Sequence, residues 1–298
     1  MVPLTEKITS SPAPANSALR ERALRALTGL PPFSPILNRL LATLAGEDAS
    51  FEKLADLIEK DTVVAGNILH LVNSAMYARR GTINSVRHAI SLLGVNKLRN
   101  AVLGMSVTRM WQNVRPAGSW SMARFNMHSA ATAMLSDMLA QHLPVNYPEG
   151  AFVAGLMHDV GRLLIAVGLP AEFDRIVAHQ RAGKRPAVEA EDAILGFTHP
   201  ELSAQALAIW KLPEPIQIAV CDHHNPPPAG PSNQLALSAV VNAADRFVHS
   251  TGISILEQNG AATVDPAALL ALGLSEDRLE RLLSQFEAEF EAMTPFFR

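Results

Sequence analysis

Residues 154–164 read AGLMHDVGRLL, and they place an ionisable pair, His158 and Asp159, inside a segment that is otherwise almost wholly apolar from Ala151 to Val167. A buried carboxylate without a partner costs several kcal/mol or shifts its pKa until the group is neutral. We therefore expect a cation beside Asp159. That cation is either a metal ion, with chemistry attached, or a structural ion-pair partner such as Arg162.

The sequence on both sides of this segment has the periodicity of helices. Nearly every segment after Ser17 repeats its apolar residues at helical spacing, and nothing alternates convincingly over the length of a strand. A clear stripe is formed by Leu279, Leu282, Leu283, Phe286 and Phe290. Proline or glycine marks the short breaks between such stripes. The sequence therefore predicts an all-α fold.

The chain of 298 residues divides into three predicted parts. Residues 1–17 are polar and contain prolines, so they are expected to form a flexible tail. Residues 18–255 form one domain, with an N-terminal helical half over 18–115 and a second half over 116–255 that contains His158. Residues 256–298 return to helical patterning, and this extension either packs on the main domain or mediates a homodimer.

Composition narrows the class of protein. A net charge of −3 gives no electrostatic reason to expect a nucleic-acid or membrane partner. The first seventeen residues lack the apolar core of a signal peptide, and charged residues or histidines interrupt every apolar run before it reaches the length of a membrane span. The single cysteine, Cys221, excludes an intrachain disulfide and fits a reducing compartment. We predict a cytoplasmic protein.

Further histidines and an aspartate recur on the predicted helices. Thr198 to Glu201 has the pattern of a capping box, which places His199 at a helix N-terminus, where the dipole favours the neutral imidazole that a metal requires. The candidate ligands are His128, His158, Asp159, His199, His223, His224 and Asp245. Iron, manganese and zinc favour such a mixture of imidazole and carboxylate.

Each of these residues also has a purely structural interpretation. The pair of His158 and Asp159 can be a satisfied ion pair in the core. A core histidine such as His128 is often bonded to a carbonyl group, and histidines at a helix end often interact with the helix dipole. Asp245 can pair with Arg246 or Arg162. A metal that only holds the helices together, without turnover, is a further alternative.

Several segments point to a known family. In the first half they are Leu30-Pro-Pro-Phe33, Ile58-Glu-Lys-Asp61, Ile68-Leu-His-Leu-Val-Asn73-Ser74-Ala75, Ile83-Asn-Ser-Val-Arg-His-Ala89-Ile90 and Leu93-Gly94-Val95. In the second half they are Ala151-Phe-Val-Ala-Gly-Leu-Met-His-Asp-Val-Gly-Arg162, His199-Pro-Glu201, Ile209-Trp210-Lys-Leu-Pro213 and His223-His224. Over residues 22 to 250 the chain resembles the HDOD domain, the HD-related output domain of bacterial signalling proteins.

This resemblance implies an HD-domain-like bundle of helices preceded by an N-terminal helical subdomain. HDOD domains look like relatives of the HD-type metal-dependent phosphohydrolases, and the metal-binding pattern of those enzymes carries over to this chain. His128 matches the first histidine, His158 and Asp159 the HD pair, His199, His223 and His224 the later histidines, and Asp245 the final aspartate. The resemblance thus implies a mononuclear or dinuclear site for a divalent metal such as Fe, Mn or Zn.

The chain also departs from the hydrolytic relatives. A proline-rich loop over residues 225–232 replaces the Gly-Tyr-Pro signature expected after the double histidine. Arg162 stands where those enzymes place a lysine, and arginine can hold a phosphate but cannot act as a general acid at ordinary pH. Arg124 stands where relatives with three metals use a glutamate. We therefore do not expect a third metal.

The family's usual role leads to the functional prediction. We expect a regulatory output module of bacterial signal transduction that acts through contacts with signalling proteins in trans and does not hydrolyse a substrate. The alternative is a metal-dependent phosphohydrolase acting on cyclic di-GMP or a nucleotide. In that alternative Asp159 bridges the metals and Arg162 holds a phosphate oxygen.

Overall fold

The computed structural model describes residues 14–29, 34–43, 51–74, 76–77, 82–116, 118–183, 186–230, 233–257 and 262–297. Within these ranges the ordered elements are helices, and extended pairing is limited to an isolated bridge between Val145 and Leu235. The predicted all-α fold is confirmed. Of the predicted tail, residues 1–13 lie outside the described ranges, whereas helix α2 already begins at Pro14.

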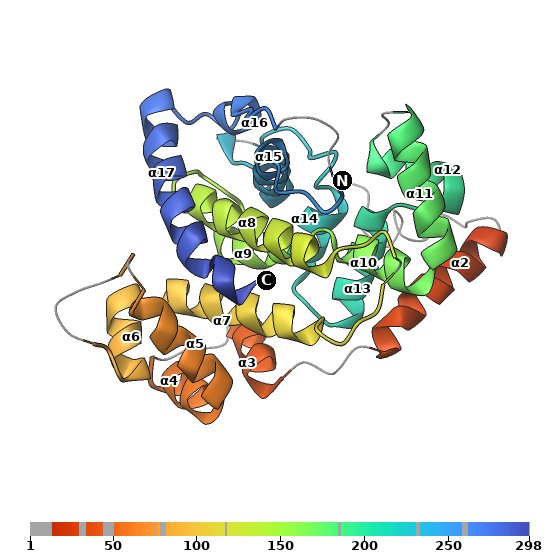
Figure 1. Cartoon of the computed structure of the whole chain (residues 1–298). Coiled ribbons are helices and arrows are strands. Elements are labelled where there is room, and N and C mark those ends of the chain that lie inside the picture. The colour runs from red at the N-terminus through yellow and green to blue at the C-terminus, as the bar shows by residue number, and fades with distance from the viewer. Residues whose placement is uncertain are drawn as a thin grey trace.

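The N-terminal half is a layer of short helices around one long helix (Figure 1). Its elements are α2 (Pro14–Arg25), η1 (Ala26–Gly29), α3 (Pro35–Thr43), α4 (Phe51–Lys60), α5 (Thr62–Val72), α6 (Val86–Leu93) and α7 (Val95–Met110). Helices α3, α5 and α6 pack against α7, and α4 packs against α5 and α6. The amphipathic stripes seen in the sequence therefore bury against one another.

Local hydrogen bonds explain where these helices begin and end. The carboxylate of Asp61 accepts from the backbone N–H groups of Val63 and Val64 and caps α5. At the other end of α5, the Asn73 side chain donates to Ile83 O and accepts from Ile83 N at 2.7 and 2.9 Å. Asn73 thus acts as a cap and turn residue that ties α5 to the segment leading into α6.

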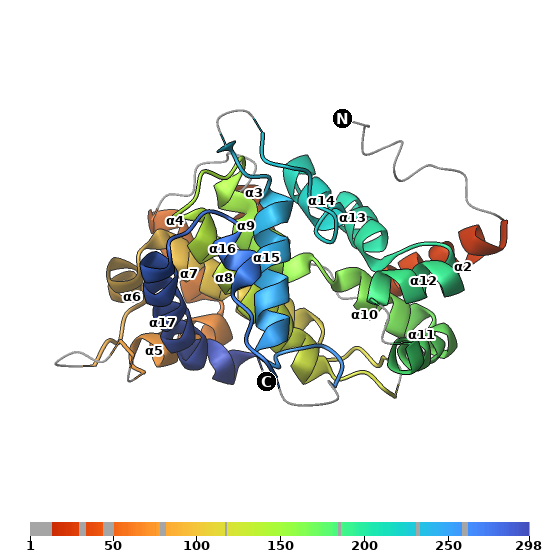
Figure 2. The same ribbon diagram turned by 90° about the horizontal axis from the view of Figure 1, so that it is seen from above.

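The second half is a bundle built around helices α8, α9 and α15 (Figure 2). Its elements are α8 (Met122–Ala140), η2 (Pro148–Gly150), α9 (Ala151–Met157), α10 (Val160–Gly168), α11 (Pro170–Gly183), α12 (Ala187–Leu195), α13 (His199–Ile209), α14 (Glu214–Cys221) and α15 (Leu237–Ser250). Helix α8 packs against α9 and α15, α10 against α13, and α14 against α13, α15 and α9. The segment AGLMHDVGRLL spans the junction of α9 and α10.

Two glycines in that segment allow neighbouring helices to approach closely. A Cβ atom on Gly155 would lie 2.7 Å from the Cα of Ala133 in α8. A Cβ atom on Gly161 would lie 2.2 Å from the backbone oxygen of His199 in α13. Because real Cβ atoms do not approach other atoms so closely, only glycine permits α8 and α13 to pack directly on the α9–α10 junction.

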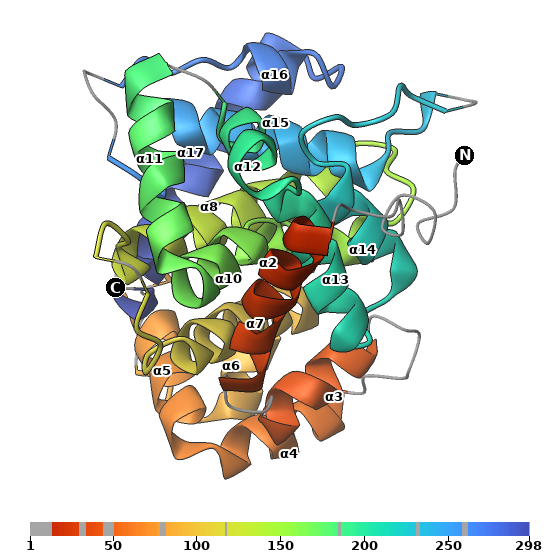
Figure 3. The same cartoon turned by 90° about the vertical axis from the view of Figure 1, so that its right-hand side faces the viewer.

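Helix α2 lies across the outside of this bundle, against α10, α12 and α13 (Figure 3). Ala23 is completely buried, and Gly168 leaves room for the α2 backbone, since a Cβ there would lie 2.9 Å from the Cα of Ala23. Arg20 bonds to Glu201 of α13 at 2.5 Å and lies 5.0 Å from the ring centroid of Phe197. Helix α2 therefore precedes the other N-terminal helices in the chain but packs on the second half.

The C-terminal extension contains α16 (Ala267–Leu270), α17 (Glu276–Met293) and η4 (Thr294–Phe296). Helix α17 packs against α8, and Glu289 pairs with Lys97 of α7 at 2.5 Å. Phe297 is fully buried, and a Cβ on Gly104 of α7 would lie only 3.0 Å from its ring. The extension thus packs on the main domain, one of its two predicted roles, and contacts both halves.

In the described part of the chain, one apolar helical segment, Pro148–Gly168, is long and apolar enough to cross a membrane by length and composition alone. The expectation that no apolar run approaches this length is therefore corrected. In the fold, 89% of this segment's most apolar window is buried by the surrounding helices. The segment is apolar because it lies at the centre of the bundle.

Candidate metal centre

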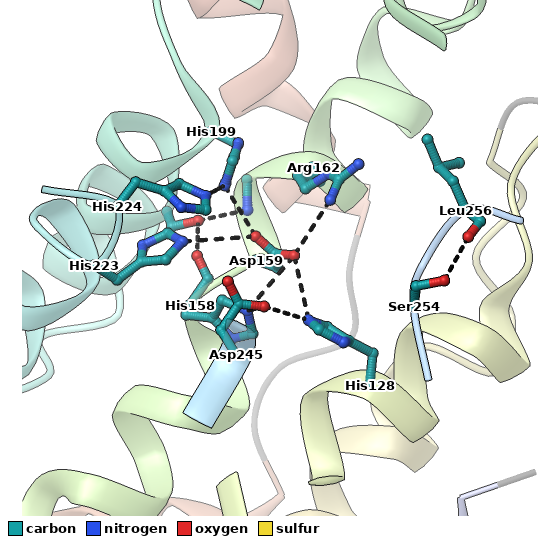
Figure 4. A network of polar contacts seen from close by, with 12 residues as sticks. His128, His158, Asp159, Arg162, His199, His223, His224, Asp245, Ser254 and Leu256 are labelled. Atoms are coloured by element: carbon teal, nitrogen blue, oxygen red, sulfur yellow. Dashed lines mark hydrogen bonds and ion pairs between the residues drawn. The ribbon is translucent and has the colours of Figure 1, made fainter. Parts of the chain in front are cut away.

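The structure brings all seven predicted ligands together at one point in the second half (Figure 4). His128 comes from α8, His158 and Asp159 from the break between α9 and α10, and His199 is the first residue of α13. The remaining residues are His223 and His224, which follow the C-cap residue of α14, and Asp245 within α15. Five separate parts of the bundle therefore contribute to one cluster.

The break at His158 and Asp159 turns the Asp159 side chain into this cluster. The backbone of Asp159 has φ −102° and ψ 11°, so α9 ends before it and α10 starts after it. Ser203 of α13 satisfies the groups that the break frees, because its Oγ donates to His158 O and accepts from Gly161 N, both at 2.8 Å. Sequence reasoning missed Ser203, which carries no signal apart from its helical spacing from His199.

Four histidines are oriented by hydrogen bonds at the Nδ1 atom. His128, His158 and His223 contact the backbone oxygens of Ile253, Gly155 and Val220 at 2.9, 2.7 and 2.6 Å, and His199 contacts Glu191 Oε2 at 2.7 Å. In each neutral ring the Nδ1–H group donates to its oxygen, which leaves the Nε2 lone pair facing the cluster. This second layer of acceptors is typical of histidines that ligate metals.

The two carboxylate oxygens of Asp159 face different histidines. Oδ1 lies 3.0 Å from His199 Nε2 and 3.9 Å from His223 Nε2. Oδ2 lies 3.5 Å from His158 Nε2 and 3.8 Å from His128 Nε2. A carboxylate placed in this way between two sets of nitrogens can bridge two cations.

The cluster therefore has two sides. The first, which we call the His199 side, consists of Asp159 Oδ1, His199, His223 and His224. The second, which we call the His128 side, consists of His128, His158 and Asp159 Oδ2, with Asp245 Oδ1 at 3.1 Å from His128 Nε2 and 3.7 Å from His158 Nε2. Each side offers a group of ligand atoms close enough together to surround one ion.

Buried polar atoms test whether a metal fits. His158 Nε2 and His223 Nε2 are buried and make no hydrogen bond to any residue in the described part of the chain. The Nε2 atoms of His199 and His224 face each other at 3.1 Å, so a proton or a cation must lie between them. Since metal–nitrogen bonds measure about 2.0–2.1 Å, one ion can contact both nitrogens. The donor set fits a divalent transition metal.

The charges around the cluster lead to the same conclusion. Asp159, Asp245 and Glu191 place three carboxylates there, and Arg162, with Nη1 3.5 Å from Asp159 Oδ2, is the nearby guanidinium. Burial opposes their ionisation, but the facing histidines, and for Asp159 also Arg162, hold the pKa values of Asp159 and Asp245 well below the usual range. Ionised carboxylates in excess over one guanidinium require further positive charge, which protonated histidines or a metal can supply.

The metal-free histidines divide into two kinds. Burial disfavours the charged ring of His199, but Glu191 and Asp159 outweigh it and raise its pKa to about 9. Burial likewise opposes protonation of His158, yet Asp159 and Asp245 raise its pKa. For His223, burial and the neighbouring histidines lower the pKa well below its usual value. Without a metal, therefore, some histidines carry the compensating charge and others stay neutral.

The predicted capping box is wrong, although α13 does begin at His199. The Thr198 side chain makes no capping hydrogen bond, and Glu201 pairs instead with Arg20. The backbone N–H of His199 donates to Glu191 Oε2 at 2.8 Å, so a residue of α12 caps α13. The expectation that the helix dipole keeps His199 neutral fails for the metal-free chain, because the charge of Glu191 is closer and larger.

The centre is almost sealed from solvent. His158, His199 and His223 are fully buried, whereas His224 is exposed. The side chains of Arg162 and Asp245 keep 15% and 13% of their surface accessible. Access to the ligands is thus confined to the edge formed by these three partly accessible residues.

Comparison with known sequences gives a family. The HDOD domain family matches residues 30–226. An uncharacterised protein of Treponema pallidum (strain Nichols) is 22% identical over 267 residues, which cover 88% of this chain and 50% of that protein. The chain thus spans about half the length of the curated relative that it matches.

Solved structures share the fold. An HDOD domain protein of unknown function from Geobacter sulfurreducens superimposes with a TM-score of 0.73 at 23% identity, over 94% of this chain and 97% of that one. A candidate signal transduction protein of Marinobacter aquaeolei VT8 gives 0.68 at 21%, over 98% and 68% of the two chains. A candidate phosphohydrolase of Shewanella amazonensis SB2B gives 0.67 at 22%, over 93% and 98%. With the family match extending over more than half of its residues, this chain belongs to the HDOD family.

Proposed function

We propose that this protein is a signal-transduction output module that binds divalent metal in the cluster around Asp159 and acts through contacts with signalling proteins. The Marinobacter relative, which is named for signal transduction, supports the signalling part of this proposal. The partners are recruited in trans. The candidate ions are iron, manganese and zinc, all of which accept mixed imidazole and carboxylate ligands.

The observation that supports the metal part of the proposal is the placement of the two Asp159 carboxylate oxygens. Its two oxygens face two sets of Nε2 atoms, and the Nδ1 atoms of four of these histidines are already held by oxygen acceptors. A structural ion pair needs neither this complete set of oriented nitrogens nor buried Nε2 atoms on His158 and His223 that make no hydrogen bond. Divalent ions held by the two oxygens of Asp159 and the facing histidines would account for both the oriented rings and the Nε2 atoms that lack a hydrogen bond.

A metal-dependent phosphohydrolase is the second candidate. It is supported by the complete ligand set and by Arg162, whose Nη1 lies 3.5 Å from Asp159 Oδ2 at the accessible edge. Bound divalent ions would polarise a phosphoryl oxygen and activate water, and Arg162 would orient the phosphate through its remaining N–H groups. Against this candidate stand the near-complete burial of the centre and the loss of the lysine that Arg162 replaces.

Elemental analysis of the purified protein, combined with a phosphodiesterase assay on cyclic di-GMP in added manganese or iron, tests the proposal. We expect one or two equivalents of metal and no turnover. The Asp159→Asn variant removes the bridging charge with little change of shape and should lose the metal. Asp192→Asn, which makes the same change at an exposed position of α12, is the matched control and should retain it.

The possible results separate the candidates. Substoichiometric metal in the wild-type protein, even after reconstitution, would contradict both metal-dependent functions. Stoichiometric metal with turnover that disappears in Asp159→Asn would replace the non-hydrolytic proposal with the phosphohydrolase. Stoichiometric metal without turnover would leave the output module as the function.

A further inference from the structure

Glu191 is a buried acidic residue that contacts the cluster and was not among the predicted ligands. It lies in α12, only 2% of its surface is exposed, and its Oε2 accepts from both the backbone N–H and the Nδ1 atom of His199, at 2.8 and 2.7 Å. One carboxylate oxygen thus fixes both the start of α13 and the orientation of the His199 ring. Glu191 faces His199 on the side away from the metal ligands, so it cannot itself share an ion with them through this oxygen.

The acceptor on His199 differs in kind from the acceptors on the other three oriented histidines. His128, His158 and His223 use neutral backbone oxygens, whereas His199 uses a carboxylate. A carboxylate that accepts from Nδ1–H increases the electron density at Nε2, so it strengthens the bond of that nitrogen to a cation. The His199 side therefore contains the strongest nitrogen donor of the four.

The two sides also differ in their ligands. The His199 side offers three imidazoles and one carboxylate oxygen, the four-coordinate nitrogen-rich set that zinc and cobalt favour. The His128 side offers two imidazoles and oxygens of Asp159 and Asp245, and this set is richer in hard oxygen ligands. His224, which is exposed, belongs to the His199 side, whereas the His128 side reaches the accessible edge through the more buried Asp245.

We propose that Glu191 is a positioning residue that makes the His199 side bind a divalent ion first and more tightly than the His128 side. This inference rests on the proposed metal binding at the cluster. The two sides then have different affinities for a divalent ion, and Glu191, which is not itself a ligand, creates the difference. Outer-shell partners of metal-bound histidines typically change metal affinity by about 10–100-fold.

Titration of the metal-free protein with Co²⁺, followed by its visible absorption and by competition with a chelator, tests the inference. The wild-type protein should bind Co²⁺ in a tight and a weak step. Glu191→Gln keeps the shape but loses the charge, so it should weaken the tight step about 10–100-fold, change its absorption spectrum and leave the weak step unaltered. Glu189→Gln, at an exposed position of the same helix, is the matched control and should behave as wild type.

A double-substitution experiment separates positioning from a general effect on the fold. In a His199→Gln background, Glu191→Gln should produce no further loss of Co²⁺ affinity, because the residue through which it acts is gone. Equal weakening of both steps by Glu191→Gln, or an unaltered tight step, would overturn the inference while leaving metal binding intact. A wild-type protein that binds no Co²⁺ would instead contradict the proposed function.

A measurement on the unsubstituted protein covers the case in which Glu191→Gln does not fold. Long-range ¹H–¹⁵N spectra of the histidine side chains should show that one equivalent of Zn²⁺ shifts the Nε2 signals of His199, His223 and His224. Those of His128 and His158 should move only with a second equivalent. Simultaneous shifts of all five signals, or earlier shifts of His128 and His158, would refute the order of binding.

Discussion

At the scale of single residues, Gly161 shows how a position without a side chain can determine the geometry of a site. A methyl group there would overlap the backbone oxygen of His199 at 2.2 Å. We expect Gly161→Ala to force α10 away from α13, to lower the free energy of unfolding by about 3 kcal/mol and to reduce metal content. Thermal unfolding and elemental analysis measure the two effects.

Gly66 provides the control for that substitution. It lies in α5, and no atom is within 4 Å of the position that a Cβ would occupy. Gly66→Ala should therefore raise stability by about 0.5–1 kcal/mol, because alanine favours a helix more than glycine does. If both alanine variants behaved alike, the close packing of α10 on α13 would not be the reason for glycine at position 161.

His199 predicts a characteristic pH dependence of the metal-free protein. Its pKa is about 9 in the fold and near 6.5 when unfolded, so the charged ring stabilises the fold fully below pH 6.5. This stabilisation is lost as the pH rises from 6.5 through 9. The free energy of unfolding falls by up to about 1.4 kcal/mol for each unit of pH. His158, whose pKa is also raised, contributes in the same direction.

Urea unfolding between pH 6.5 and 9.5, with a chelator or with Zn²⁺, measures this dependence. A histidine that binds zinc is neutral, so the zinc-loaded protein should not lose stability over the same interval. His199→Gln should flatten the curve of the metal-free protein. A metal-free wild-type protein whose stability is constant or rises over this interval would contradict the charged state of His199.

At the scale of elements, the docking of α2 depends on one part-buried cation. Arg20 joins Glu201 and the face of Phe197, whereas Arg25 pairs with Glu21 on the exposed face of the same helix. We expect Arg20→Gln to destabilise the protein by about 1–2 kcal/mol and to make α2 accessible to trypsin. Arg25→Gln should leave stability essentially unchanged, because that ion pair is exposed to solvent. Limited proteolysis and thermal unfolding of the two variants distinguish these expectations.

The sequence predicted the helices better than the contacts between their ends. Helical periodicity was sufficient for the all-α fold, and the order of histidines and aspartates indicated the residues that converge. The role of Glu191 was not predictable, because a glutamate in a short amphipathic helix normally faces solvent. The capping box failed for the same physical reason. Thr198 and Glu201 match the local pattern of a capping box, but each is replaced or engaged by a residue outside that pattern. The N–H group of His199 donates to Glu191, and Glu201 pairs with Arg20 of α2.

At the scale of the whole molecule, Phe297 links the C-terminus to both halves. Its ring lies against Gly104 of α7, and Phe152 of α9 approaches the same glycine. Phe297→Ala should lower the free energy of unfolding by about 3–5 kcal/mol, as is usual for loss of a buried phenylalanine. Phe296→Ala, at a half-buried position where the ring contacts His70, should cost clearly less. Similar losses for both would mean that Phe297 does not join the two halves.

The position of Asp159 at the centre of the bundle has a consequence for the order in which the chain can fold. The histidines that face its carboxylate extend from His128 in α8 to His223 beyond the end of α14, so they are far apart in the chain. A nascent polypeptide that has been synthesised only as far as α10 lacks His199 and His223, so burying Asp159 at that stage is unfavourable. The α9–α10 segment should therefore remain only loosely collapsed on the ribosome until α13 and α14 have emerged. Such dependence on distant contacts favours slow folding, with closure of the centre as a late step.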